Sequence, residues 1–309
     1  MSADVIQTDL HVHCLAEDMI PDEVHAARAV ARRSEPPTPE HLERMVARSR
    51  ANSADQHGRL LRKDLEAADI RRALLIGLDW GLMGEATPAT GPEVQLDWAE
   101  ALVTEHEPFF RFAFCIDPRR PEAASLTRRA LRHDWVAGIK LYPPTGFSPI
   151  DPICDSIYEA VCDAGAFVLF HTGRTTYPFE LERGRVEHYS TVQRRYPMMR
   201  IVLGHSGFPL WGTHAVTVAS GHPGTSVEVS GWHRYMGAHD AEVTAHLRLA
   251  FQELGAHRVL FGSDHLSGPG FSGDTAIGTW KERFQQEAEA AGADVQDSES
   301  AAGRLLERS

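Results

Sequence analysis

Cysteine is scarce in this chain of 309 residues, and its four examples stand singly at positions 14, 115, 154 and 162. No Cys-x-x-Cys pair is present, which excludes a zinc knuckle, and the spacing does not resemble the disulfide framework of a small secreted domain. Three of the four lie in apolar surroundings, where a thiol usually acts as a small buried residue.

Long apolar runs and basic clusters are also missing. No run approaches the roughly 20 residues that a membrane-spanning helix needs, and the N-terminus lacks the basic region and apolar stretch of a secretory signal. The formal net charge is -12 with no Lys/Arg block, which disfavours a nucleic-acid surface. We therefore predict a cytoplasmic protein that binds neither membrane nor nucleic acid.

The remaining composition is that of a folded globular protein with a sizeable core, since 42% of the residues are hydrophobic and 24% are charged. Short apolar runs alternate with segments of helical spacing along most of the chain. The runs predicted to be strands are 5–10, 72–78, 110–116, 136–141, 167–170, 200–203, 226–229 and 258–261.

Continuous apolar strands that alternate with helices predict a parallel sheet covered on both faces. Eight such units are the number in a closed (β/α)8 barrel. We predict an α/β protein with this TIM-barrel fold, as a single domain over residues 1–309. A doubly wound open sheet is the alternative, but it offers no reason for eight similar strand ends.

Two segments are additions to the regular alternation of strands and helices. Residues 22–68 are polar and favour helices, with Thr38 as N-cap and Pro39 at the first helical position of one of them. This segment is long for a connection between two strands, so we predict a helical insertion that caps the site. Residues 274–309 are predicted to form closing helices.

Metal-binding side chains stand at the ends of the predicted strands. His11 and His13 are two residues apart, so in an extended chain their side chains point to the same face. An isolated pair of this kind is a weak signal and requires further ligands. Strand ends meet at one mouth of a barrel, and the later ones carry Lys140, His171, His205 and Asp264. Imidazole and carboxylate are ligands that zinc, manganese and iron(II) accept.

Five motifs together resemble the amidohydrolase superfamily: DLHVH, GIKLYPP, FHTG, LGHSG and LFGSDH. The nearest branch is amidohydrolase 2, which includes aminocarboxymuconate-semialdehyde decarboxylase, γ-resorcylate decarboxylase, and lactone and amide hydrolases. The resemblance runs from about Val5 to Asp264. It is specific for the superfamily and poorly specific for the reaction.

The resemblance implies that one divalent metal ion, zinc or alternatively Mn2+ or Fe2+, is held by His11, His13, His171 and Asp264. It also implies that His205 is an acid/base or polarising group, and that Asp264 accepts the proton of the attacking water. In binuclear relatives, a lysine at the position of Lys140 is carbamylated and bridges two metals. A single-metal site, with Lys140 as a barrel residue or a cation facing an anionic substrate, is the expected arrangement here.

Further residues just past the strand ends are candidates for substrate contact. Arg174 follows His171 by three residues and could clamp a carboxylate. The aromatic and imidazole candidates are Trp80, Tyr142, Tyr177, Trp232, His233 and His265. The histidines predicted to be surface residues are His25, His41, His57, His214 and His222.

Together these features predict a metal-dependent hydrolase that acts on an amide, lactam or lactone bond of a small molecule through metal-activated water. The alternative on the same frame is non-oxidative decarboxylation of an aromatic or unsaturated carboxylic acid. A third hypothesis is a non-catalytic metal-binding or scaffold protein that descends from such an enzyme. The intact set of ligands argues against it. A homodimer is compatible with the family, although no interface is visible in the sequence.

Overall fold

The structure is a computed structural model that describes residues 5–31, 33–82, 90–175, 177–271, 273 and 276–308. Single positions of the predicted insertion (residue 32) and of the closing segment (residues 274, 275 and 309) lie outside the described residues. Within the described parts, no helix has the combined length and hydropathy that crossing a membrane requires.

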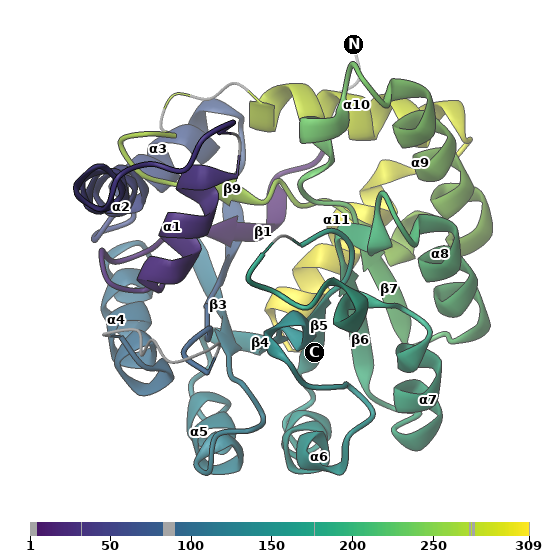
Figure 1. Cartoon of the computed structure of the whole chain (residues 1–309). Helices are drawn as coiled ribbons and strands as arrows, with labels where there is room; N and C mark the ends of the chain where they lie inside the picture. The colour runs from purple at the N-terminus through teal and green to yellow at the C-terminus, as the bar shows by residue number, and fades with distance from the viewer. Residues whose placement is uncertain are drawn as a thin grey trace.

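The described residues form a nine-stranded, all-parallel sheet whose strands follow one another in chain order (Figure 1). The strands are β1 (Thr8–His13), β2 (Arg72–Ile76), β3 (Phe110–Cys115), β4 (Val136–Leu141), β5 (Phe167–His171), β6 (Arg200–Gly204), β7 (Thr225–Glu228), β8 (Val259–Leu260) and β9 (His265–Leu266).

The ring closes between the first and last strands. β8 pairs with β7, and β9, only a few residues further along the chain, pairs with β1. Between them, the Leu10 amide donates to the carbonyl of Phe261 (3.1 Å) and the Asp264 amide donates to the carbonyl of His11 (2.8 Å). The last two strands therefore fill one barrel position, and the predicted (β/α)8 barrel is confirmed.

Helices surround the barrel and bury their apolar stripes against the outer faces of the strands (Figure 1). This two-sided burial explains why the strands read as nearly continuous apolar runs. The helices of the outer ring are α3 (Arg59–Ala67), α4 (Pro92–Glu105), α5 (Ala123–Ala130), α6 (Asp155–Asp163), α7 (His188–Arg195), α8 (Gly212–Gly221), α9 (Asp240–Leu254) and α10 (Ala276–Ala290).

α8 does not follow β6 directly. Residues 205–207 instead form a tight turn, η4 (His205–Gly207), in which all three residues have positive φ.

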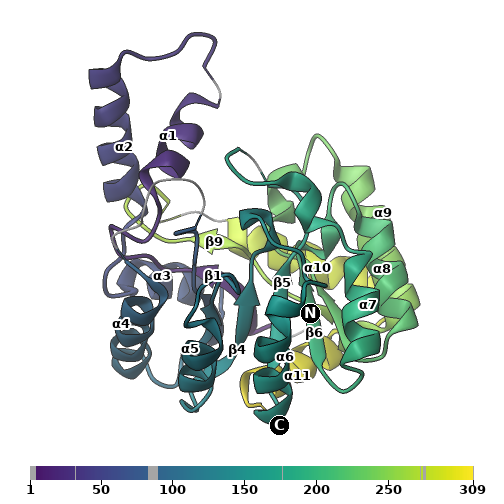
Figure 2. The same cartoon turned by 60° about the horizontal axis from the view of Figure 1, so that its bottom comes forward.

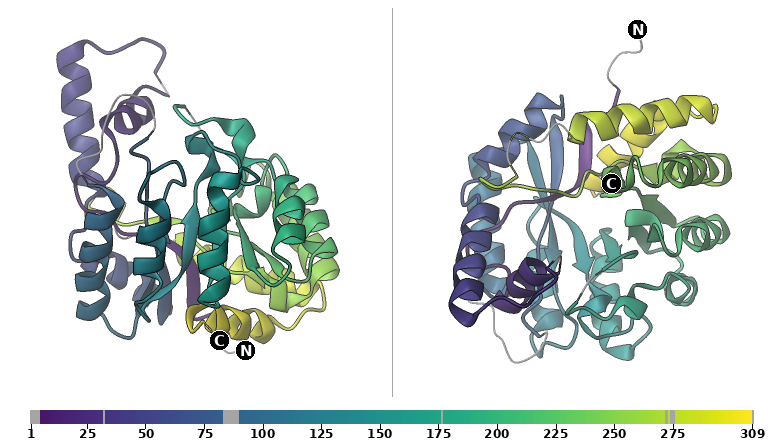
Figure 3. Two further views of the ribbon diagram at one scale, coloured as in Figure 1. Left: turned by 90° about the horizontal axis from the view of Figure 1, so that it is seen from below. Right: turned by 45° about the horizontal axis from the view of Figure 1, so that its top comes forward.

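Inside the barrel, a second apolar cluster is closed from below by the final helix, α11 (Val295–Leu306). The inward residues include Leu74, Leu169 and Leu260, and they pack with Leu305 and Leu306 of this helix. Figure 3 shows α11 crossing one end of the barrel. The strand ends at the opposite end are thereby left for the site.

The insertion after β1 has two parts. α1 (Asp22–Val30) and α2 (Pro39–Ser53) project beyond the mouth of the barrel as a helical pair (Figure 2), whereas α3 belongs to the outer ring. As predicted, α2 begins at Pro39, and the Thr38 side chain accepts a hydrogen bond from the His41 amide. The prediction that His25 lies at the surface is wrong, because its Nδ1 contacts Ser49 Oγ (2.9 Å) between the two helices and its side chain is buried.

The packing of α11 generates a stability prediction. Leu306→Ala removes a buried side chain from the bottom of the barrel and should lower the free energy of unfolding by about 2–5 kcal/mol. Leu210→Ala, at a side chain that is 51% exposed, is the control and should have little effect. Urea denaturation followed by circular dichroism compares the two. Equal losses in both variants would contradict a plugging role for α11.

Candidate metal centre

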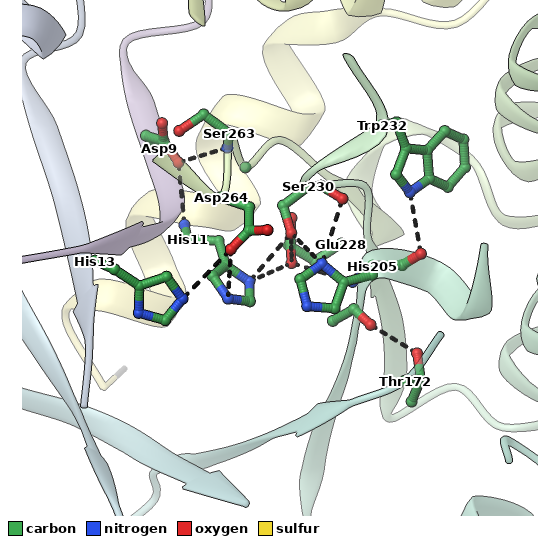
Figure 4. Close-up of polar contacts among 12 residues, drawn as sticks. Asp9, His11, His13, Thr172, His205, Glu228, Ser230, Trp232, Ser263 and Asp264 are labelled. Carbon is green, nitrogen blue, oxygen red and sulfur yellow. Dashed lines mark hydrogen bonds and ion pairs between the residues drawn. The ribbon is translucent and has the colours of Figure 1, made fainter. Parts of the chain in front are cut away.

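β1 brings His11 and His13 to the barrel mouth, where both rings face Asp264 (Figure 4). The distance from His13 Nε2 to Asp264 Oδ1 is 3.3 Å, and that from His11 Nε2 to the same oxygen is 3.9 Å. Ligand atoms of the three residues lie within 4.8 Å of one another. The three donor atoms are therefore close enough together to bind one metal ion.

The other nitrogen of each ring is already held. His13 Nδ1 lies 3.1 Å from the carbonyl oxygen of Ile76, which can only accept, so this histidine carries its proton on Nδ1. His11 Nδ1 lies 2.8 Å from Glu228 Oε2. Metal-binding histidines commonly donate their second N–H to a carboxylate or a carbonyl in this way. Both Nε2 atoms are thus oriented for a metal ion.

His171, at the end of β5, joins the same cluster. Its ring centroid is 4.7 Å from that of His205, which in turn lies 4.7 Å from the His11 ring. Within the described residues, His171 Nε2 is buried and has no hydrogen-bond partner. A buried nitrogen of this kind needs a partner, and a metal ion satisfies that need. His11, His13 and Asp264 therefore fit a divalent ion, and His171 is a further candidate ligand beside His205.

The protonation states suit such an ion. Burial lowers the pKa values of His11 and His171 well below the usual histidine value, and it lowers the pKa of His205 to about 4. Burial alone would raise the pKa of Asp264, but the positive charge of Arg234 outweighs it and holds this pKa well below its usual range. Neutral imidazoles and an ionised carboxylate are the forms that bind metals.

Glu228, which the sequence analysis missed, lies at the centre of the supporting hydrogen bonds (Figure 4). Its Oε2 contacts His11 and also accepts from Ser230 Oγ (2.9 Å), which is 2.8 Å from His205 Nδ1. The predicted strand ended at Val229, whereas β7 ends at Glu228. A second candidate group of ligands, His11, His205 and Glu228, shares these contacts. The short hydrogen bond between His11 Nδ1 and Glu228 Oε2 indicates that this glutamate orients the candidate ligand His11.

Lys140 lies on β4, and its side chain is buried. Among the described residues, its Nζ has no hydrogen-bond partner, as is also true of Glu228 Oε1. Burial lowers the pKa of Lys140 and raises that of Glu228. A lysine in this environment has a larger neutral fraction than one in water. Carbamylation and contact with a substrate therefore both stay predictions for Lys140.

The backbone at the site adopts unusual conformations. His205, Ser206 and Asp264 have φ values of 63°, 47° and 57°, which non-glycine residues seldom adopt. The indole N–H of Trp232 donates to the carbonyl of His205 (3.0 Å). Asp9 Oδ1 accepts from the amides of both His11 and Ser263 (3.0 Å each), and so ties β1 to the turn that carries Asp264. Such strain persists where surrounding contacts enforce it and is common at functional sites.

The predicted substrate residues occupy different environments. Trp80 and Tyr142 pack together (centroids 5.5 Å apart), and the Tyr142 ring lies 4.3 Å from that of His171. Trp232 is buried and stacks on Phe208. The other predicted residues are His265, which contacts Asp64 Oδ2 (3.2 Å), the exposed Arg174 and Tyr177, and the partly buried His233. Only Trp80 and Tyr142 of this set therefore form an aromatic surface next to the histidine cluster.

Two arginines at the mouth were not predicted. Arg234 Nη1 contacts Asp264 Oδ2 (2.5 Å), and its Nη2 donates to the carbonyl of the same residue (2.8 Å). Arg28, on α1, lies with its guanidinium carbon 5.8 Å from the centre of the Trp80 ring, and its charge is felt by Asp264. The position of Arg234 after β7 could have marked it as a candidate. The sequence contains no comparable signal for Arg28.

The sequence matches the amidohydrolase family described as "Amidohydrolase" over residues 8–298. The chain belongs to this family, and the resemblance seen in the sequence is confirmed. The family is metal-dependent. A search of curated proteins finds no match.

Solved structures share the fold at low sequence identity. The 5-carboxyvanillate decarboxylase of Sphingomonas paucimobilis is 16% identical, with a TM-score of 0.61 over 98% of this chain and 99% of that one. A mutant of the Novosphingobium aromaticivorans enzyme of that name, with bound manganese, is 12% identical, with a TM-score of 0.66 over 99% and 98%. A probable 2-pyrone-4,6-dicarboxylic acid hydrolase of Acinetobacter baumannii is 12% identical, with a TM-score of 0.56 over 97% and 98%.

The donor geometry predicts the effect of removing ligands. After loading with zinc or manganese, His13→Ala and His171→Ala should lose most of the bound ion, because each removes one donor of the cluster. His57→Ala, at an exposed histidine, is the matched control and should keep the wild-type metal content. Elemental analysis by mass spectrometry measures the content. Full retention in the cluster variants would refute the assignment of these residues as ligands.

The close packing of Glu228 predicts a sensitive glycine. A Cβ at Gly262 would lie 2.2 Å from Glu228 Oε1 and 2.9 Å from the His11 Cβ. Gly262→Ala should displace Glu228, weaken metal binding about tenfold or more, and lower the free energy of unfolding by about 1–3 kcal/mol. Gly278→Ala, where a Cβ meets nothing within 4 Å, is the control. Isothermal titration with zinc and chemical denaturation test both effects, and unchanged metal affinity would argue against a supporting role for Glu228.

Proposed function

We propose that this chain is a divalent-metal-dependent hydrolase that opens a lactone, lactam or amide bond in a small anionic molecule. The observation that carries the proposal is the pairing of an ionised Asp264 with a neutral His205 beside the cluster of imidazoles. An ionised carboxylate and a neutral imidazole can both accept protons, as hydrolysis by water requires.

The residues that would hold the ion are His11, His13, His171 and Asp264, with zinc as first choice and manganese or iron(II) as alternatives. When bound, the ion supplies a Lewis acid that lowers the pKa of water towards about 7 and polarises a carbonyl group. Proton transfer and binding of the substrate depend on side chains of the protein.

Asp264 and His205 have complementary roles in this proposal. Arg234 holds Asp264 Oδ2 and keeps the carboxylate ionised, while Oδ1 faces the histidines. Asp264 can take the proton of the attacking water but, as a weak base, retains it only briefly. His205 Nδ1 is engaged by Ser230 Oγ, whose own proton goes to Glu228. His205 Nε2 is therefore left to exchange a proton with the substrate.

Positive charge at the mouth supports an anionic substrate. Arg28 projects from the insertion towards the charge of Asp264, and Lys140 contributes a second cation from the barrel wall. Trp80 and Tyr142 supply an aromatic surface beside His171, against which a flat ring can pack. A cyclic ester or amide that bears a carboxylate combines these features.

A decarboxylase of aromatic or unsaturated acids is the second candidate. It is favoured by the same aromatic surface and by Arg28, which could hold the carboxylate of a ring-bearing acid. In that reaction His205 Nε2 would first take a proton from water or from a hydroxyl group of the acid, and would then pass it to the carbon that loses carbon dioxide. The two reactions differ in their need for water and in their products.

Assays of both reactions test the proposal. The metal-loaded protein should release acid from members of a panel of carboxylated lactones and amides, followed with a pH indicator. Asp264→Asn and His205→Gln should each lower the rate about 10²- to 10⁴-fold. Arg28→Gln should raise KM more than it lowers kcat, because it removes a charge that binds the substrate in the ground state.

Hydroxybenzoates and unsaturated dicarboxylates form the second arm, with release of carbon dioxide as the readout. Carbon dioxide formed from these acids, with every lactone and amide left intact, would overturn the hydrolase proposal in favour of the second candidate. Wild-type activity in His205→Gln would overturn the role given to His205 in either reaction.

A further inference from the structure

Three aromatic rings form a cluster at the mouth of the barrel, and we call this cluster the aromatic wall. Trp80 follows β2, Tyr142 follows β4, and Phe179 follows β5. The ring centroids are 5.5 Å apart for Trp80 and Tyr142, 4.9 Å for Trp80 and Phe179, and 5.1 Å for Tyr142 and Phe179. Because the rings come from three separate loops, the shape of the wall depends on what holds those loops together.

A buried aspartate fixes the first of these loops. Asp79 immediately precedes Trp80, and its Oδ2 accepts a hydrogen bond from the backbone amide of Asp117 (2.7 Å), just past the end of β3. The guanidinium of Arg120 binds the same carboxylate twice, from Nε to Oδ2 (2.7 Å) and from Nη2 to Oδ1 (2.6 Å). Three hydrogen bonds therefore fix the residue next to Trp80.

A second buried aspartate extends these contacts to the loop of Tyr142. The carboxylate of Asp117 accepts from Arg119 Nε (2.9 Å) and Nη2 (2.7 Å), and its Oδ2 lies 2.9 Å from the hydroxyl oxygen of Thr145. The Thr145 amide donates to the carbonyl of Tyr142 (3.1 Å), and Arg119 Nη2 also donates to the carbonyl of Thr145 (2.9 Å). We call the residues that make these contacts the aspartate network: Asp79, Asp117, Arg119, Arg120 and Thr145.

The loop of the third ring is joined to the same place. Glu180, the residue after Phe179, donates its amide to the carbonyl of Pro144 (2.8 Å). Pro144 lies in the short turn η1 (Pro143–Thr145), which ends in the aspartate network. The loops that carry all three rings are thus connected through backbone and carboxylate hydrogen bonds.

The charges of the aspartate network suggest a role beyond stability. Both aspartates are buried, and the side chain of Arg120 is only 16% exposed. Removing an ion pair from water costs free energy that offsets much of its attraction, so a buried pair is weak evidence for added stability. Bidentate hydrogen bonds between a guanidinium and a carboxylate do, however, impose one relative geometry. The network is therefore better suited to fixing positions than to adding stability.

We propose that the aspartate network positions the aromatic wall and thereby sets the preference of the site for flat substrates. A wall that is already ordered loses little side-chain entropy when a ring packs against it. The network acts through the wall and does not itself touch the substrate. This inference rests on the proposed function in one respect, which is that the substrate lies beside His171, where Tyr142 stands. It does not depend on which bond is broken.

Calorimetric titration of the metal-loaded protein with phthalate and with adipate tests the proposal. Both probes are dicarboxylates of equal charge, but phthalate has a flat ring and adipate has a flexible chain. The wild type should bind phthalate more tightly. Arg120→Gln should reduce this preference about two- to tenfold, because binding must then order a side chain of the wall. Arg120→Lys keeps the charge and should retain part of the preference.

A double variant separates positioning from general destabilisation. Trp80→Leu should remove most of the preference, and combining it with Arg120→Gln should change the preference little further, because the arginine acts through the wall. Thr145→Val removes one hydroxyl of the network and should also reduce the preference, which provides a second test if Arg120→Gln does not fold. Arg129→Gln, at an arginine whose ion pairs with Glu93 and Asp97 are exposed, is the matched control and should leave the preference unchanged.

Two results would overturn the proposal. The first is an unchanged preference in folded Arg120→Gln or Thr145→Val with only a lower unfolding temperature, which would assign the network a purely structural role. The second is a wild type that binds both probes equally or binds neither at millimolar concentration. Because neither probe contains a lactone or an amide, the titrations can succeed even if the hydrolase assay fails, so the two failures are distinguishable.

Discussion

The buried hydrogen bond between His11 and Glu228 is the contact on which the site depends. It joins the first strand to the seventh across the barrel mouth, and both side chains are almost completely buried. It fixes the His11 ring so that Nε2 faces the other ligands. The same carboxylate receives the hydroxyl of Ser230, which contacts His205, so the proposed ligand and the proposed acid/base group share one support. Gly262 leaves the space that this carboxylate occupies.

The site holds several ionisable groups out of water, which is costly unless each finds a partner. Its histidines avoid this cost because they stay neutral, which follows from their lowered pKa values. Asp264 stays ionised because the guanidinium of Arg234 contacts it. A divalent cation adds positive charge next to this carboxylate and gives the buried His171 nitrogen a partner. The fold thus prepares both the geometry and the charge of the site before an ion arrives.

Much of this arrangement could be predicted from the sequence. The strands are apolar runs because both faces of a barrel strand are buried, and polar residues at their ends are conspicuous for that reason. His11, His13, His171, His205 and Asp264 were found in this way, and the structure brings them together at one mouth.

Other residues of the site could not be recognised from the sequence. Glu228 stands between two valines in a short strand, where one polar residue also fits an ordinary exposed position. Arg28 belongs to the insertion, and its approach to Trp80 depends on how α1 folds back over the barrel. A periodic pattern carries no information about such long-range packing, which only the assembled fold determines.

The closure of the barrel has a consequence for assembly. Asp264 lies at the seam where the end of the chain meets β1, so the four proposed ligands come from the beginning, the middle and the end of the barrel. An ion bound there fastens the first strand to the last. The complete set of proposed ligands comes together only in the closed ring, so a bound ion would stabilise the closed barrel relative to open forms of the chain. The proposed ion would thus cross-link β1 to the last turn of the barrel, two parts of the chain that are far apart in the sequence.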